Sequence, residues 1–87
     1  MKIWKWTLDV IGVQTILMPK AAKVLSVHMQ HGKPQLWALV DEDAPVERRK
    51  FATYGTGQPL PNISDHGEFV GTYQIQDALV FHVFDQS

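Results

Sequence analysis

Hydrophobic and polar side chains alternate with a period of two along most of the chain. In residues 4–10, WKWTLDV, apolar side chains occupy every second position, and polar side chains fill the positions between them. This period is typical of a β-strand with one buried face. Trp4 and Trp6 then share a face, and we expect both in the hydrophobic core.

Turn residues divide the chain into short segments of this kind. Gly12 separates the first segment from residues 13–19, which predicts a hairpin, and Pro19 ends the second segment because proline has no N–H for a β-ladder. The sequence HGKP lies between residues 23–30 and 35–40 and predicts a second hairpin.

Two segments have apolar side chains at both odd and even positions: QLWALV at residues 35–40 and ALVFHVF at residues 78–84. We expect them to be central strands that are covered on both faces. The segments RRKFATY and EFVGTYQIQ complete a set of about seven short strands, and no window has a convincing helical apolar stripe. The sequence therefore predicts an all-β fold, a small antiparallel sandwich or barrel of about seven short strands.

Size and composition predict one β domain, over residues 1–87, that self-associates. The chain has no cysteine, so its hydrophobic core holds it together without disulfides or thiolate metal sites. Hydrophobic residues make up 45% of the chain, with three tryptophans and four phenylalanines. Because small domains often gain stability by burying one face in an oligomer, we predict a homo-oligomer.

The net charge of the chain and its N-terminal sequence restrict the classes of partner that we expect. The formal net charge of −1 argues against general nucleic-acid binding, which needs a surplus of Lys and Arg. The N-terminal segment MKIWKWTLDV lacks the apolar region and the cleavage site of a signal peptide. No apolar run approaches the roughly 20 residues of a membrane-spanning helix. We therefore expect a soluble protein without a membrane partner, in the cytoplasm where it is made.

The segment ATYGTGQPLPN, residues 52–62, resembles the start of a phosphate-binding loop. A P-loop continues into a helix, whereas this segment continues into Pro59 and Pro61. Either its glycines take positive φ angles in a structural loop, or its backbone N–H groups form a nest for an anion. In the second case arginines at the surface would clamp a phosphate. The candidate ligand-binding residues are then Arg48, Arg49, Lys50, Thr53, Tyr54, Gly55, Thr56 and Gly57.

Histidines and acidic residues suggest no metal site. His28 and His31 form an H-x-x-H pair, but the two side chains would face opposite sides of a strand. His82 lies in the most apolar segment and is expected to be buried and hydrogen-bonded. The acidic run at residues 41–43 precedes Pro45 and is typical of a solvated turn. We predict no metal, no cofactor and no catalytic residues.

Seven short motifs follow one another along nearly the whole chain: KIWKWTL, QTILMPK, LSV, PQLWALVD, ATYGTGQPLP, FVGTYQ and ALVFHVF. In this order they resemble a family of small proteins of unknown function that tailed bacteriophages and prophages encode. The resemblance carries over no catalytic or binding residue. It implies a phage origin, and small phage proteins of this kind often inhibit a host system by binding a host enzyme or a signalling molecule.

These observations favour a binding function. We predict a phage-encoded, non-enzymatic protein in the cytoplasm of the infected bacterial host. It would counter a defence system by sequestering a nucleotide-derived signalling ligand at a subunit interface or by blocking a host protein. The alternatives are a small nucleotide-cleaving enzyme and an accessory protein of the virion or its assembly.

Overall fold

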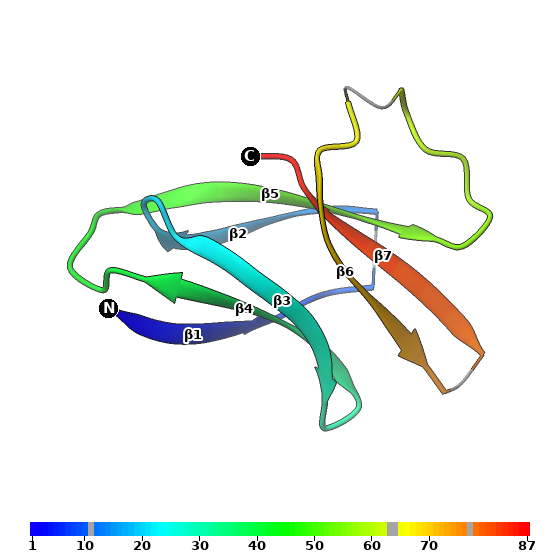
Figure 1. The fold of residues 1–87 in the computed structure, drawn as a ribbon, viewed down its shortest axis with the longest axis horizontal. Coiled ribbons are helices and arrows are strands. Elements are labelled where there is room, and N and C mark those ends of the chain that lie inside the picture. The colour runs from blue at the N-terminus through cyan, green and yellow to red at the C-terminus, as the bar shows by residue number, and fades with distance from the viewer. Residues whose placement is uncertain (11, 63–64, 77) are drawn as a thin grey trace.

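Seven antiparallel strands in two sheets make up the fold in the computed structural model, which describes residues 1–10, 12–62, 65–76 and 78–87 (Figure 1). In chain order the strands are β1 (Lys2–Thr7), β2 (Val13–Pro19), β3 (Lys23–Gln30), β4 (Lys33–Val40), β5 (Val46–Gly55), β6 (Glu68–Ile75) and β7 (Leu79–Asp85). None of the described residues belongs to a helix that could cross a membrane. The predicted all-β sandwich class and strand number are confirmed.

One sheet has three strands in the order β1-β4-β3, and the other has four in the order β2-β5-β7-β6. β4 and β7 each lie between two neighbours, as their apolar sequences predicted. β3 and β6 lie against each other where the two sheets meet (Figure 1). The fold is thus a sandwich whose sheets come together along the edge strands β3 and β6. The other edge strand is β1 in the three-stranded sheet and β2 in the four-stranded sheet.

The predicted first hairpin is wrong, because the connection after β1 leads into the other sheet. β1 pairs with β4, and β2 pairs with β5. The Leu8 N–H donates to the Pro34 carbonyl (2.9 Å) in one sheet, and the Thr53 N–H donates to the Gly12 carbonyl (2.6 Å) in the other. Leu8 is also buried in the core. These contacts favour a crossing between the sheets over a tight turn.

The predicted hairpin between β3 and β4 is confirmed. His31 and Gly32 join the two strands with φ angles of 53° and 76°. Two successive positive φ angles are those of a type I′ turn, whose twist matches that of the flanking strands. Glycine adopts the second of them without steric cost.

The hydrophobic core fills the space between the two sheets. β4 supplies Leu36 and Ala38, and β5 supplies Phe51, all three completely buried. Trp4 and Trp6 share the inner face of β1, as predicted, because they pair with Ala38 and Leu36. Trp6 packs against the core, whereas Trp4 is exposed, so the expectation that both belong to the core is wrong for Trp4.

Two β-bulges interrupt the alternation that the sequence predicts. One extra residue, Leu25, is inserted in β3, and another, Val70, is inserted in β6. After each inserted residue, the alternation between the inner and outer faces of the sheet is shifted by one position. Simple alternation along β6 would put Phe69 on the same face as Tyr73, but Phe69 lies on the outer face of its sheet, opposite Phe84.

The Tyr73 hydroxyl is buried between the sheets, beside the buried hydroxyl of Thr53. Burial raises the pKa of Tyr73 above its ordinary value of about 10, because the charged phenolate would lose its hydration. The Thr53 hydroxyl offsets part of this effect on the pKa.

The free energy of unfolding is therefore expected to depend on the ionisation of the Tyr73 hydroxyl at alkaline pH. The unfolded chain releases the Tyr73 proton near about pH 10, while the folded chain retains it to higher pH. The contribution of the neutral Tyr73 hydroxyl to the free energy of unfolding is fully present below about pH 10, and it is lost as the pH rises through the pKa of the folded state. In urea titrations between about pH 9 and pH 11, the wild type should lose stability faster than Tyr73→Phe. Parallel pH profiles for the two proteins would contradict this expectation.

Candidate functional site

Six of the eight predicted ligand-binding residues lie on β5, and the alternation of the strand divides them between two faces. Arg48, Lys50 and Tyr54 belong to the outer face of the four-stranded sheet. Arg49 and Thr53 project between the sheets, where Thr53 is buried. The structure does not bring the eight residues together in one site.

The basic run and the glycine loop are also far apart. Arg48 precedes Gly55 by seven positions on one extended strand, which corresponds to about 23 Å. An arginine side chain is much shorter than this distance. A phosphate held at the loop would therefore be out of reach of the Arg48 guanidinium.

The glycine loop is closed by hydrogen bonds of its own. Gly57 has a φ of +87°, as predicted, whereas Gly55 does not have the positive φ that was expected. The Gly55 N–H donates to Gln58 Oε1 (3.0 Å), and the Gln58 N–H donates to the Gly55 carbonyl (3.0 Å). The Thr56 N–H donates to the Val80 carbonyl (3.1 Å). Three donors that an anion nest would use are thus already engaged.

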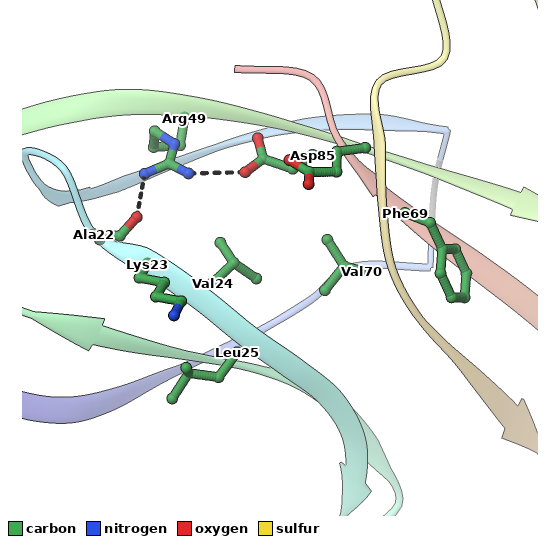
Figure 2. Close-up of a pocket in the computed structure, with 9 residues that line it drawn as sticks. Ala22, Lys23, Val24, Leu25, Arg49, Phe69, Val70 and Asp85 are labelled. Atoms are coloured by element: carbon green, nitrogen blue, oxygen red, sulfur yellow. Dashed lines mark hydrogen bonds and ion pairs between the residues drawn. The ribbon is translucent and has the colours of Figure 1, made fainter. Parts of the chain in front are cut away.

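Arg49 forms the floor of a pocket of about 380 Å³ between β3 and β6 (Figure 2). Its guanidinium donates to the Ala22 carbonyl (2.9 Å) and to the Asp85 carboxylate (2.8 Å). The Arg49 and Asp85 side chains are only 11% and 17% exposed. Figure 2 shows Val24 and Val70 pointing toward each other across the pocket. The pocket thus has a charged floor and apolar walls.

The expectation that Arg49 lies at the surface is wrong. Its position on the inner face of β5 directs the side chain between the sheets, where Asp85 balances its charge. Lys23 and Glu68 line the same pocket, so two cationic and two carboxylate side chains border it. The pocket therefore has no excess of positive charge for a phosphate. The Arg49 guanidinium connects β5 with Asp85 on β7 and with Ala22, the residue before β3.

A cluster of aromatic side chains lies on the outer face of the four-stranded sheet. Phe84 is at its centre, with its ring centroid 4.9 Å from that of His66, 5.6 Å from Phe69 and 5.7 Å from Tyr54. The rings meet in the tilted or edge-to-face arrangements that aromatic pairs prefer. The Gln86 amide donates to the Tyr54 hydroxyl (3.4 Å) and to the His66 carbonyl (3.3 Å). We call Tyr54, His66, Phe69 and Phe84 the aromatic face.

Of this group, sequence reasoning had selected Tyr54 alone. The sequence of β7 predicted that both of its faces are covered, but the outer face carries no second layer of described strands, and Phe84 stays partly exposed. Phe69 joins the cluster because of the bulge at Val70. One signal was available, since Gly71 lies inside the predicted strand, and a glycine there is typical of a bulge.

His82 lies beside the aromatic face, on β7, and bridges two threonine hydroxyls. Its Nε2 atom is 2.7 Å from Thr56 Oγ1, and its Nδ1 atom is 2.9 Å from Thr72 Oγ1. A neutral imidazole donates from one nitrogen and accepts at the other, and a hydroxyl can do either. The predicted hydrogen bonding of His82 is confirmed, but the side chain is only half-buried. It holds Thr56 of the glycine loop on the same outer face.

Two exposed cations extend the outer face beyond the aromatic rings. Ala52 pairs with Phe84, and Lys50 and then Arg48 follow from Ala52 along β5. Two strand positions separate Lys50 from Ala52, which corresponds to about 7 Å. Aromatic rings, hydroxyl groups and positive charges thus share one open face. Such a face can stack a planar ring and bind an anion at one end.

The His, Asp and Glu side chains of the described residues do not gather in any group of three or more that could hold a metal ion. Comparison with curated proteins and with solved structures found no match to the chain. A protein-family model, described as a domain of unknown function (DUF7352), matches residues 1–87. The chain therefore belongs to the DUF7352 family.

Proposed function

We propose that this domain is a non-enzymatic binding protein that holds a nucleotide-derived ligand on the aromatic face. The proposal is carried by one observation, the presence of the Phe84-centred ring cluster and of Lys50 and Arg48 on the same exposed sheet face. Phe69 is the most accessible of these rings, at 56% exposed, and a base would stack on it. The phosphate groups would lie toward Lys50.

Two kinds of contact would contribute to the affinity for such a ligand. Stacking of a base on an aromatic side chain contributes about 1–3 kcal/mol and tolerates different bases. Hydrogen bonds from Lys or Arg to phosphate are stronger than those between neutral groups. The hydroxyls of Thr56 and Thr72, ordered by His82, are available for the polar edge of a base or a sugar.

The resemblance to small proteins of tailed bacteriophages and prophages supports a more specific role. We propose that the protein acts in the cytoplasm of the infected bacterium and counters a defence system by sequestering a nucleotide-derived signal. A binder that holds the signal unaltered lowers its free concentration by mass action. Cleavage of the nucleotide and blocking of a host protein are the competing functions.

Ligand release after heat denaturation distinguishes these functions. The protein is incubated with mononucleotides, linear dinucleotides and cyclic dinucleotides, separated from free ligand, and heated. Chromatography of the supernatant should then recover an intact nucleotide. Recovery of a cleaved product would indicate an enzyme instead. Failure to retain any nucleotide would refute nucleotide binding and favour a host protein as the partner.

Phe69→Ala is expected to weaken binding of the retained nucleotide about tenfold or more, because it removes the stacking surface. Isothermal titration calorimetry measures the change in dissociation constant. Leu79→Ala is the matched control, since Leu79 is also 56% exposed but lies at the turn between β6 and β7, away from the aromatic face. An equal loss of affinity in both variants would contradict the placement of the base on Phe69.

A further inference from the structure

β2 is an exposed edge strand that carries no charged side chain. It pairs with β5, and no other described strand pairs with it. Its sequence, VQTILMP, contains no Lys, Arg, Asp or Glu. Edge strands in natural proteins are protected by charges, prolines, bulges or a covering segment, because their free backbone groups otherwise pair with another chain. β2 has only Pro19 of these, at its last position.

The other three edge strands carry such charges. β1 contains Lys2 and Lys5, β3 begins with Lys23, and β6 begins with Glu68. β3 and β6 also lie against each other where the sheets meet. β2 is therefore the one edge, among the described strands, that has neither a charge nor a neighbouring sheet edge to protect it.

Hydrogen bonds at the two ends of β2 determine which of its backbone groups face β5. The Lys20 N–H donates to the Pro45 carbonyl (2.7 Å), and the Gly12 carbonyl accepts from the Thr53 N–H (2.6 Å). In an antiparallel pair, residues that bond to the neighbour alternate with residues that do not. The even-numbered residues from 12 to 20 therefore direct their backbone groups to β5.

The odd-numbered residues Val13, Thr15 and Leu17 direct their backbone groups out of the sheet edge. Each supplies one N–H donor and one C=O acceptor. The three side chains lie on the outer face and are exposed. The edge thus presents alternating donors and acceptors in the arrangement that another antiparallel strand requires.

We propose that β2 pairs with β2 of a second copy of this chain, in antiparallel orientation about a two-fold axis. With Thr15 on the axis, Thr15 faces the partner's Thr15, and Val13 faces the partner's Leu17. This register is self-complementary, because Thr–Thr and apolar cross-strand pairs both stabilise sheets and no like charges meet. The two four-stranded sheets then form one continuous sheet.

The pairing would combine the outer faces of the two copies. Arg48 and Lys50 lie on β5 next to β2, so these cations from both copies would flank the centre of the joined face, with an aromatic face farther out on each side. A single strand pair forms a small interface, and we expect a dissociation constant of roughly micromolar order. The inference is independent of the proposed ligand and is tested in its absence.

Sedimentation equilibrium of the full chain without ligand, from about 1 to about 100 µM, should show a transition from the 9.9 kDa monomer to twice that mass. Leu17→Lys places a charge on the β2 edge and should raise the dissociation constant at least about tenfold. Ile3→Lys is the matched control on edge strand β1, since Ile3 and Leu17 are both 60% exposed. Circular dichroism verifies that both variants fold.

A disulfide test reports the register directly, because the chain has no cysteine. Residues of a hydrogen-bonded antiparallel pair have Cα atoms about 5.5 Å apart, within the range that a disulfide spans. Thr15→Cys should give a covalent dimer on mild oxidation, whereas Thr7→Cys, on β1, should not. The proposal is overturned if the wild type stays monomeric, if Ile3→Lys weakens association as much as Leu17→Lys, or if Thr7→Cys cross-links equally fast.

Discussion

Arg49→Ala is expected to lower the free energy of unfolding by about 3 kcal/mol, whereas Arg48→Ala should change it by less than about 0.5 kcal/mol. The two arginines are neighbours in the chain, but Arg49 is 11% exposed and bound to Asp85, while Arg48 is exposed on the outer face. Loss of Arg49 leaves the Asp85 carboxylate largely buried without its cation. Urea unfolding of the two variants measures both changes.

A double variant separates the charge effect from the loss of packing. Arg49→Met combined with Asp85→Leu removes both charges, and replacing a buried ion pair with apolar side chains is often close to neutral for stability. The double variant should therefore be more stable than Arg49→Ala. If Arg48→Ala were as destabilising as Arg49→Ala, the assignment of the two arginines to opposite faces of β5 would be refuted.

Gly67→Ala is expected to cost about 3 kcal/mol, and Gly57→Ala only about 1–2 kcal/mol. Both glycines have a φ of +87°, an angle that L-residues such as alanine rarely adopt. They differ in their surroundings. A Cβ atom at Gly67 would collide with the Asp85 carbonyl oxygen and lie 2.9 Å from its carbonyl carbon, whereas a Cβ atom at Gly57 would meet nothing within 4 Å.

Thermal unfolding of the two variants measures this difference, because the shared φ makes Gly57→Ala a direct control for backbone strain. The collision at Gly67 involves the backbone of β7, which cannot move as a flexible side chain does. An equal decrease in melting temperature for both variants would show that φ alone determines the cost. The close contact between Gly67 and β7 would then add nothing to the cost of the Gly67→Ala substitution.

The strand content was predictable because local pattern determines it. The period of two in WKWTLDV and the two apolar strands β4 and β7 identified the all-β class and the central positions. The turn at His31 and Gly32 was also predictable, because a two-residue turn has strict φ requirements. Each of these features involves residues close together in the chain.

Strand partners and faces were less predictable, because they depend on residues far apart in the chain. Gly12 was compatible with a hairpin, but Leu8 and Gly12 bond to different sheets. The single inserted residue Val70 moved Phe69 to the outer face. A bulge of one residue leaves the apolar content of the strand unchanged, so alternation alone does not locate it.

The candidate site likewise has some features that were predictable from the sequence and others that were not. The sequence selected Arg48, Lys50 and Tyr54 as chemically suitable residues, and the alternation of β5 is compatible with one shared face for them. It did not show that Arg49 is held by Asp85, because that ion pair joins residues 36 positions apart.

The sequence by itself therefore determined that this protein is built of short antiparallel strands, since hydrophobic periodicity and turn chemistry are local properties. Apart from the β3–β4 hairpin, the tertiary structure alone decided which strands are neighbours. It also decided which arginine is buried and which aromatic rings gather around Phe84. Those features arise when two sheets pack face to face, and packing selects among several pairings that the local pattern leaves equally open.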